Sequence, residues 1–550
     1  MGDGSKKGDG GGLQTDRRMI LGAAAAIATT VAATSAKALS LPSFGGGGGD
    51  DPKAYTQYGW VTGELDDGVN VFKGIPYGAP TGGGARFMAP ELPHSWSGMK
   101  ACRKFGDQSP QETRKDRPAA WASWNVNVGE SEDCLSVNVW TPGLRDGKKR
   151  PVMVWMHGGG YSEFNGSSPA YDGVRLCQRG DVVLVTLNHR LNLFGYLYLA
   201  DLAGSQFADS GNVGQLDLIA ALQWVRDNIT EFGGDPGRVT IFGESGGGGK
   251  VSTLLAMPAA KGLFHRAAIQ SGPGLTAIKP DAATAVATAV CEALHINPTK
   301  AGDLQKATTD RLVDAIKAVT ASGGRLGPVL DGRNLTRDPF SPDAPAISSD
   351  VPILLGYNAT ETTILGPPAG AFDLDWAGLK AALAPSMAGG DTDKLISDFK
   401  RLRPGATPSD LYFHISTLRG MGLASWTLAE RKAGLNAAGA YFYRLEFATP
   451  VDRLRSPHAL DIPLVFDTVG KSASLLAPVA ADAQKVADQM SAAWIAFART
   501  GSPNAAGLSS WPRYDARSRS TMVFNVVSRA VNDPYPEERA IISALPPTRP

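Results

Sequence analysis

A serine flanked by glycines stands in the segment Gly243-Glu244-Ser245-Gly246-Gly247, directly after the apolar run at residues 239–242. The order of buried strand, tight turn and helix start is the context that a G-x-S-x-G nucleophile turn requires. The glycines let neighbouring backbone approach without a Cβ clash. Glycine-rich turns that contain serine are also common in α/β proteins, so the motif alone is only moderately specific. Ser245 is therefore a candidate nucleophile that needs support from other residues.

A histidine and a carboxylate would have to activate Ser245, because a serine hydroxyl is a weak nucleophile at neutral pH. His458 is the candidate base, since it lies on a predicted loop after the apolar run 441–447, late in the chain. The other histidines stand in polar surroundings, in other motifs or in a predicted helix: His94, His157, His189, His265, His295 and His414. Glu361 follows the apolar run 353–356 and precedes the histidine in chain order, as the acid should. The alternatives are an ordinary surface histidine and a surface turn glutamate.

Acyl transfer also needs hydrogen-bond donors for the developing oxyanion, each worth on the order of 3 kcal/mol. The segment His157-Gly158-Gly159-Gly160 follows an apolar run and supplies unobstructed N–H groups. We expect the donors to be Gly159, Gly160 and the amide of Gly246, which opens a helix. The alternative is a phosphate-binding loop, but neither glycine-rich segment has the G-K-[ST] ending that such a loop carries.

Buried strands and amphipathic helices must position these residues. Residues 152–156, 182–187 and 239–242 are short, continuously apolar runs, which are typical of strands buried on both faces. Residues 216–229 have apolar positions at helical spacing. No repeat of fixed period is present, so we predict an α/β class protein with a single catalytic domain at residues 55–550. The long segments between the strands should form lids and loops.

Composition restricts the partners. The chain has 550 residues, is 43% hydrophobic and has a formal charge of +1, because 54 basic residues nearly cancel 53 acidic ones. It therefore has no field to attract nucleic acid or anionic lipid, and we expect a small neutral substrate. The four cysteines form no C-x-x-C pair and have no histidine at zinc-ligand spacing. No metal, cofactor or partner protein is predicted.

The first residues have the features of an address for export. Arg17-Arg18 precedes a mild apolar run at residues 21–33 and the A-x-A pattern Ala36-Lys37-Ala38, which predicts a twin-arginine signal at residues 1–38. The alternative is a membrane anchor, but the run is shorter than the roughly 20 apolar residues that span a bilayer. Five glycines then predict a flexible linker at residues 39–54. We expect a periplasmic or secreted protein with no stable membrane anchor after cleavage.

Further motifs extend the pattern over nearly the whole mature chain. They include Phe72-Lys73-Gly74-Ile75-Pro76-Tyr77, Ser131-Glu132-Asp133-Cys134-Leu135, Asn188-His189-Arg190-Leu191, Phe232-Gly233-Gly234-Asp235-Pro236 and Trp511-Pro512. These motifs, the glycine-rich segments and the candidate catalytic residues follow one another in the order typical of the type-B carboxylesterase family. The chain therefore resembles this family, which includes the cholinesterases and bacterial nitrobenzyl-ester hydrolases. The resemblance implies an α/β-hydrolase fold, with a mostly parallel twisted β-sheet covered by helices and with loops and helical insertions that form a gorge. It also implies ester hydrolysis to acid and alcohol through an acyl-enzyme, with Glu361 and His458 in the catalytic acid and histidine positions.

The chain departs from that family at several positions. The residue after the nucleophile is ordinarily alanine and here is Gly246, and a glutamate often found three residues after the histidine is Asp461. The family disulfide joins Cys134 to a C-x-Q segment, which Ser109-Pro110-Gln111 replaces here. Cys102 could take over as partner only if its loop shifts, so a Cys102–Cys134 bridge is a hypothesis.

Trp124 precedes Ser131 by the spacing that separates the cholinesterases' cation-binding tryptophan from their S-E-D-C motif. It could stack on an aryl or cationic group of the substrate, or it could simply pack its own loop.

We expect a monomer or weak oligomer. Two other functions remain as alternatives to a general esterase. One is a specialised hydrolase of a bulky diester, lactone or xenobiotic ester, which would use identical chemistry. The other is a non-catalytic binding protein such as the neuroligin-like adhesion proteins. Those proteins typically lack the nucleophile, which this chain retains.

Overall fold

A large twisted sheet forms the centre of the fold in the computed structural model, which describes residues 1–2, 51–112, 117–387 and 389–546. In the described residues this sheet has eleven strands, in the order β14-β13-β12-β11-β10-β9-β7-β8-β6-β4-β3. The strands are β3 (Glu64–Asp66), β4 (Val69–Pro76), β6 (Ser136–Thr141), β7 (Arg150–Met156), β8 (Val183–Leu187), β9 (Gly234–Glu244), β10 (Arg266–Gln270), β11 (Ile353–Asn358), β12 (Ala440–Leu445), β13 (Ser520–Phe524) and β14 (Arg529–Asn532). Pairing is parallel from β8 to β13 and antiparallel at both edges. The predicted mostly parallel α/β sheet is confirmed.

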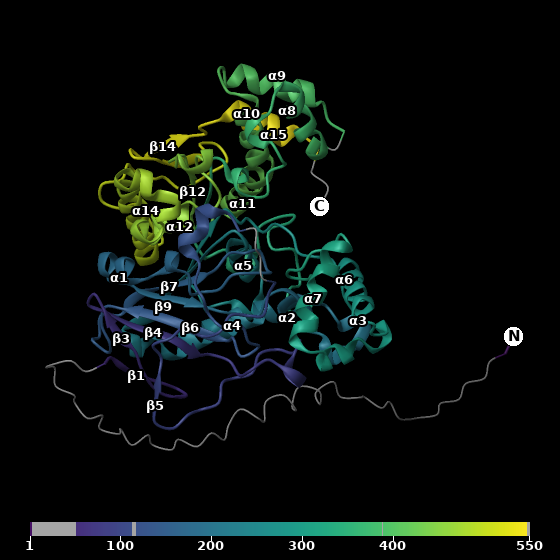
Figure 1. Ribbon diagram of the computed structural model, residues 1–550, viewed down its shortest axis with the longest axis vertical. Coiled ribbons are helices and arrows are strands. Elements are labelled where there is room, and N and C mark those ends of the chain that lie inside the picture. Colours follow the sequence, from purple (N-terminus) through teal and green to yellow (C-terminus); the bar gives the residue numbers. More distant parts are fainter. Residues whose placement is uncertain (3–50, 113–116, 388, 547–550) are drawn as a thin grey trace. The chain divides into compact units, whose positions relative to one another are not determined.

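Strand β7 shows why these runs are apolar throughout. Val152 and Val154 belong to one buried core with helix α4 (Val213–Asn228), whereas Trp155 belongs to a second core with α14 (Ala480–Thr500). Alternate side chains of a strand point to opposite faces, so a sheet covered on both faces needs apolar residues at every position. Figure 1 shows the β7–β9 region of the sheet and the long helix α14 that packs against it.

The remaining helices lie on the faces of the sheet or in insertions between strands. They are α1 (Val174–Gly180), α2 (Asn192–Tyr196), α3 (Ala200–Ala203), α5 (Gly246–Leu254), α6 (Pro280–Ala293), α7 (Thr309–Ala321), α8 (Trp376–Leu383), α9 (Thr392–Leu402), α10 (Pro408–Thr417), α11 (Leu423–Gly434), α12 (Asp461–Val465), α13 (Ala473–Leu476) and α15 (Pro536–Ala544). Helices α6 and α7, which come between β10 and β11 in the sequence, pack against each other (Figure 1). Helices α8, α9, α10 and α15 form a second group. The predicted helical insertions are therefore present.

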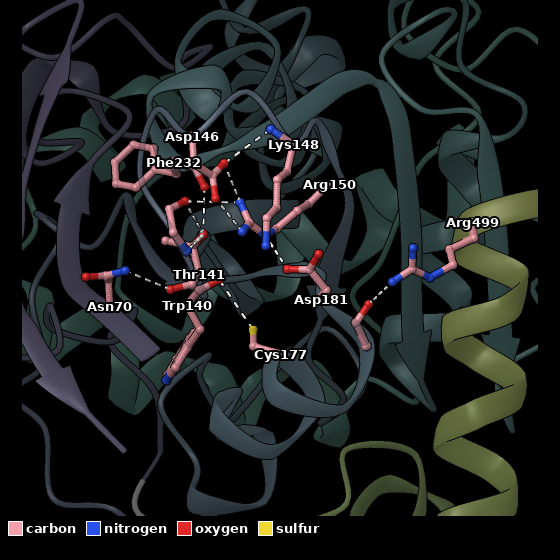
Figure 2. Close-up of polar contacts among 12 residues, drawn as sticks. Asn70, Trp140, Thr141, Asp146, Lys148, Arg150, Cys177, Asp181, Phe232 and Arg499 are labelled. Atoms are coloured by element: carbon pink, nitrogen blue, oxygen red, sulfur yellow. Dashed lines mark hydrogen bonds and ion pairs between the residues drawn. The ribbon is translucent and has the colours of Figure 1, made fainter. Parts of the chain in front are cut away.

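The start of β7 is fixed by a buried arginine, which Figure 2 shows in detail. The Arg150 guanidinium donates to Asp181 Oδ1 at 2.6 Å, and to Asp146 Oδ2 at 2.6 Å and Oδ1 at 2.9 Å. Its side chain is 2% exposed, so these two carboxylates balance a charge that would be costly to bury alone. The opposite end of β7 leads into the glycine-rich segment at residues 157–160.

The first strand begins earlier than the sequence predicted. Strand β1 (Lys53–Thr56) starts inside the predicted linker at residues 39–54 and pairs antiparallel with β2 (Gly59–Thr62). Ala54 is buried there, because the alternation of this short segment turns one face to the core. A third strand, β5 (Met99–Ala101), completes this small sheet. The described residues from 51 to 546 form one compact unit. Apart from residues 1–2, the predicted signal at residues 1–38 lies outside the described residues, as do residues 39–50 of the linker.

All four cysteines are buried free thiols, so the hypothetical Cys102–Cys134 bridge is not formed. The shift that it required is opposed by the backbone of Cys102. The N–H of Cys102 donates to Thr62 O at 2.7 Å, and its carbonyl accepts from Lys73 N at 2.7 Å. Within the described ranges, no helix has the length and apolarity that crossing a bilayer requires.

Candidate active site

Ser245 lies at the junction of β9 and α5, at the predicted sharp turn. Its backbone has φ +56° and ψ −125°, a conformation that costs energy for a residue with a Cβ and that is found mainly at functional sites. The turn is held because the Ser245 N–H donates to Gln270 O at 2.8 Å, at the end of the neighbouring strand β10. The serine is half-buried and its hydroxyl has no hydrogen bond among the described residues, so it is free to meet a ligand.

Glu361 and His458 form a direct pair. The carboxylate Oε2 of Glu361 lies 2.5 Å from His458 Nδ1. The other carboxylate oxygen, Oε1, accepts from Ser271 Oγ at 2.6 Å and from the N–H of Asn358 at 2.7 Å. Glu361 is 1% exposed and His458 3%, so neither is the surface residue that the sequence left open. The carboxylate is positioned to fix the orientation of the imidazole.

Parallel strands bring these side chains together. Ser245 directly follows β9, Glu361 follows β11 after a short turn, and His458 lies on the loop after β12. Strands β9 to β12 are consecutive neighbours in the sheet, and their carboxyl ends meet at one edge. Residues far apart in sequence therefore share one place in the fold.

Ser245 and His458 line the same cavity, which has a volume of about 720 Å³. The second ring nitrogen of His458, Nε2, lies 3.1 Å from Oε1 of Glu244, the residue before the serine. No hydrogen bond joins Ser245 to His458 in the described chain. The imidazole thus has a carboxylate at each ring nitrogen, with the serine beside it on the cavity wall.

Sequence reasoning missed Glu244, although its place directly before the nucleophile at the end of a buried strand was a signal. Glu244 is 2% exposed, and its pKa is raised to about 8, first by burial and then by the carboxylates of Asp461 and Glu361, against the effect of His458. Burial alone would lower the pKa of His458, but Glu244 and Glu361 outweigh it and raise that pKa to about 9. The site therefore favours a proton on the imidazole.

Asp461, the residue that departs from the family pattern, also belongs to this buried group. Its Oδ2 accepts from the Tyr443 hydroxyl at 2.7 Å and from Gln270 Nε2 at 3.0 Å. Burial raises the pKa of Asp461, and its charge contributes to the raised pKa of His458. The shorter side chain is thus well anchored behind the histidine.

The glycine-rich segment at residues 157–160, which we call the oxyanion loop, lies directly on the first turn of α5. Gly159 and Gly160 have φ of +83° and +62°, a region that favours glycine. A Cβ added to Gly246 would come within 1.9 Å of Gly160 O, so only glycine fits this approach. In the described residues the N–H groups of Gly159, Gly160 and Gly246 have no hydrogen-bond acceptor. They are available to an oxyanion beside Ser245.

Aromatic side chains form another wall of the cavity. Trp124 ends a short 3-10 helix (Ala119–Trp124) and stacks on Trp121, with ring centroids 6.1 Å apart and an interplanar angle of 14°. Phe164 meets Trp121 edge-on at 6.2 Å. The indole N–H of Trp124 donates to Ser472 Oγ at 2.9 Å, which fixes the ring. Trp124 therefore packs its loop and lines the cavity at once; sequence reasoning missed Trp121 and Phe164.

Among the described residues, no group of three or more histidine, cysteine, aspartate and glutamate side chains is placed to hold a metal ion. The chemistry available at the cavity is that of a serine, a buried imidazole, carboxylates and unpaired backbone N–H groups.

The sheet, the serine turn and the buried histidine–glutamate pair define an α/β-hydrolase fold with the parts of a serine esterase. The chain belongs to the carboxylesterase family, whose model matches residues 50–368 and 406–540. It is 35% identical over 499 residues to the para-nitrobenzyl esterase of Bacillus subtilis, a match that covers 88% of this chain and 97% of that protein. It is 34% identical over 496 residues to the fumonisin B1 esterase of Sphingopyxis macrogoltabida, covering 85% of this chain and 86% of that protein.

A solved structure gives the same result. The carboxylesterase of Geobacillus stearothermophilus superposes with a TM-score of 0.78 at 35% identity, covering 89% of this chain and 99% of that one. The predicted family and fold are confirmed, and the protein is a serine carboxylesterase that hydrolyses carboxylic esters to acid and alcohol.

Proposed function

We propose that Ser245, His458 and Glu361 carry out this hydrolysis as a catalytic triad. Ser245 Oγ attacks the ester carbonyl carbon while His458 takes its proton, and His458 then returns the proton to the leaving alcohol. Water attacks the resulting acyl-enzyme by the same route and releases the acid. Glu361 stays in contact with Nδ1 throughout, so that it holds the histidine tautomer and stabilises the imidazolium.

The observation that carries the proposal is the 2.5 Å contact between Glu361 Oε2 and His458 Nδ1, in a histidine that shares a cavity wall with Ser245. A carboxylate at Nδ1 directs the other nitrogen, Nε2, toward the proton it must take. The proposal requires the imidazole to turn from Glu244 toward the serine hydroxyl when substrate binds, and catalytic hydrogen bonds are often long before that point.

The oxyanion that forms on the ester carbonyl would be bound by the N–H groups of Gly159, Gly160 and Gly246. These donors are fixed in backbone and unpaired, so they need no rearrangement when charge develops. Their place against the nucleophile turn supports this role.

Labelling by a fluorophosphonate tests the proposal and separates it from the non-catalytic alternative. The phosphorus is attacked by an activated serine with loss of fluoride, so the intact protein should gain one adduct, mapped to Ser245 in the peptide digest. Ser245→Ala should take up none and lose ester hydrolysis. Labelling at another serine, or hydrolysis that survives in Ser245→Ala, would contradict the triad.

For the substrate, we propose esters with a bulky or aryl group. The cavity of about 720 Å³ is walled by Trp121, Trp124 and Phe164 and has Ile364 and Leu365 on a further side. Such a wall favours flat apolar groups, and a volume of this size exceeds the needs of a short alkyl ester. The names of two relatives, para-nitrobenzyl esterase and fumonisin B1 esterase, point to bulky esters for those proteins and support the specialised-hydrolase alternative here.

A panel of esters tests this proposal. Short, medium and long acyl chains, each with aryl and alkyl alcohols, should show kcat/KM rising with an aryl group. Equal rates across the alcohols would favour a general esterase, and a preference for long acyl chains alone would favour a lipase.

We propose that the protein is exported through the twin-arginine route and works in the periplasm or outside the cell, as a monomer or weak oligomer without a membrane anchor. The proposal rests on Arg17-Arg18, the apolar run and the Ala36-Lys37-Ala38 pattern. Expression with the native leader and with a leader that carries both Arg17→Lys and Arg18→Lys, followed by fractionation and N-terminal sequencing, tests it. A mature N-terminus at residue 39 outside the cytoplasm is expected only for the native leader.

A further inference from the structure

A lysine without a counter-charge is buried behind the oxyanion loop. Lys250 lies on α5, one turn after Ser245, and its side chain is 0% exposed. Its ammonium donates to the carbonyl oxygen of His157 at 2.9 Å, and no carboxylate pairs with it in the described residues. The aromatic ring of Tyr161 lies 5.8 Å from Nζ. The role of this lysine is not part of the mechanism above.

Stability does not account for Lys250. Burial of an unpaired ammonium is costly. The neighbouring imidazoles of His157 and His189 cannot supply a negative charge, and burial, with a further effect of Lys250, lowers the pKa of both and favours their neutral form. A costly group beside the nucleophile therefore calls for a function at the site.

The contact of Lys250 falls at the start of the oxyanion loop. The peptide bond is planar and trans, so a His157 carbonyl directed at Lys250 fixes the N–H of Gly158 in the opposite direction. Met156, the residue before His157, is restrained too, because its carbonyl lies in close contact with the backbone of α5. A Cβ added to Gly247 would lie 1.9 Å from Met156 O. The loop then crosses the helix to Gly160, whose carbonyl lies against Gly246. Lys250 thus holds the oxyanion loop to α5 by a side-chain hydrogen bond.

We propose that Lys250 is a positioning residue, which sets the oxyanion donors Gly159 and Gly160 by holding the carbonyl of His157. Burial lowers the pKa of Lys250 to about 7, but the charged and the neutral amine both keep an N–H for this carbonyl. The contact therefore persists on both sides of neutral pH. This inference rests on the proposed roles of Ser245 and the oxyanion glycines.

The test compares Lys250→Met, which keeps an unbranched side chain but has no donor, with a matched control. Lys432 is a second buried lysine, 1% exposed, and its Nζ donates to the carbonyls of Ser348 at 2.8 Å and Ser349 at 3.1 Å, away from the cavity. Lys432→Met therefore reports the cost of removing a buried lysine as such.

Two readouts distinguish positioning from folding. One is the split of kcat and KM for an aryl ester. The other is the ratio of the inhibition constants of an aryl trifluoromethyl ketone and the matching methyl ketone. Ser245 Oγ adds to the trifluoromethyl ketone carbon, its proton passes to His458, and the carbonyl electron pair becomes an oxyanion in the loop, whereas the methyl ketone binds largely without this addition.

Lys250→Met should lower kcat by about tenfold to a hundredfold, less than the loss of a direct donor, with KM changed little. It should weaken the trifluoromethyl ketone by a similar factor and leave the methyl ketone unchanged. Lys432→Met should lower the melting temperature without changing the relation of kcat to KM or the preference for the trifluoromethyl ketone over the methyl ketone. Wild-type kcat and ketone selectivity in Lys250→Met would overturn the proposal.

If Lys250→Met does not fold, Lys250→Gln is measured in the same way, because its amide nitrogen is one bond too short to reach the carbonyl in place. The same losses of kcat and of trifluoromethyl ketone affinity in Lys250→Gln would support the proposal. Wild-type values of both in Lys250→Gln would overturn it. Failure of the triad itself is recognised separately, because the wild-type enzyme would then show no preference for the trifluoromethyl ketone and Ser245→Ala would retain activity.

Discussion

Glu244 and His458 lie side by side in the lining of the cavity, with Oε1 of the glutamate 3.1 Å from Nε2 of the histidine. In the proposed triad, the same nitrogen accepts the proton of Ser245. Under this proposal the glutamate competes with the serine for the imidazole, and its charge raises the pKa of His458.

Glu244→Gln should shift the pH profile of hydrolysis. His458 must be neutral to act as a base, so activity rises with pH through its pKa, which Glu244 and Glu361 raise to about 9. Removing one of these carboxylates lowers that pKa, and the acidic limb of kcat/KM should move to lower pH by about one unit. Rates between about pH 5 and 10 measure it, with the exposed Glu537→Gln as control. An unmoved limb would show that Glu244 does not set the basicity of His458.

Glu361→Gln should lower kcat by about a thousandfold or more, because the amide no longer holds the required tautomer or stabilises the imidazolium. The melting temperature should change little by comparison. Ser271→Ala is the matched control, since it removes a 2.6 Å donor to Glu361 but keeps the carboxylate at His458. Its loss should be much smaller. Equal losses in the two variants would argue that Glu361 acts only by packing.

Gly246→Ala should impair the enzyme, although the resemblance to the family implies that alanine is ordinary at this position. The new Cβ would meet Gly160 O at 1.9 Å, so the oxyanion loop must move away from the serine. We expect kcat to fall by about tenfold to a hundredfold, which steady-state kinetics would measure. Gly434→Ala, on α11 with open space around it, should be silent. Full activity in Gly246→Ala would mean that the loop adapts freely.

Trp124→Ala should reduce selection for aryl esters. Loss of an aromatic contact is worth about 0.5–1.5 kcal/mol, or roughly twofold to tenfold in kcat/KM for aryl over alkyl esters. A choline ester tests the cation-binding reading in the same assay. Trp376→Ala, a 43% exposed tryptophan that faces Lys400, is the control. Unchanged ratios for aryl, choline and alkyl esters would leave Trp124 with the packing role alone.

Glu538→Gln should destabilise the group of helices α9, α10 and α15. Burial would raise the pKa of Glu538, but hydrogen bonds from His414 at 2.7 Å and Arg403 at 2.8 Å outweigh it and lower that pKa to about 2. A lowered pKa gives stability above the unfolded value of about 4.3 that is lost as pH falls toward about 2. Denaturant unfolding at neutral pH should show a loss of about 1–3 kcal/mol, and less at about pH 3. A loss that does not shrink with pH would contradict the ionic role.

The sequence predicted the buried strands and the order of the serine, the glutamate and the histidine, because these depend on local apolar runs and on motif spacing. It did not predict that Glu244 faces His458 or that Lys250 holds the His157 carbonyl. Both contacts depend on how a helix start and a loop pack across the sheet edge, which spacing does not encode. The sequence also could not show that Cys102 stays a free thiol. Its backbone is held by hydrogen bonds to Thr62 and Lys73, on strands that are distant in sequence.

The first turn of α5 has a consequence for how new specificities could arise. Gly246 and Gly247 meet the oxyanion loop through main chain alone, so no rotamer has to be selected there during turnover. Substitutions at Trp121 or Leu365 can therefore reshape what the cavity admits without resetting the donors, whereas the Phe164 ring packs against Gly159. With the roles proposed here, selectivity and reactivity are encoded on separate parts of the chain, and directed evolution of the cavity walls should change selectivity at little loss of reactivity.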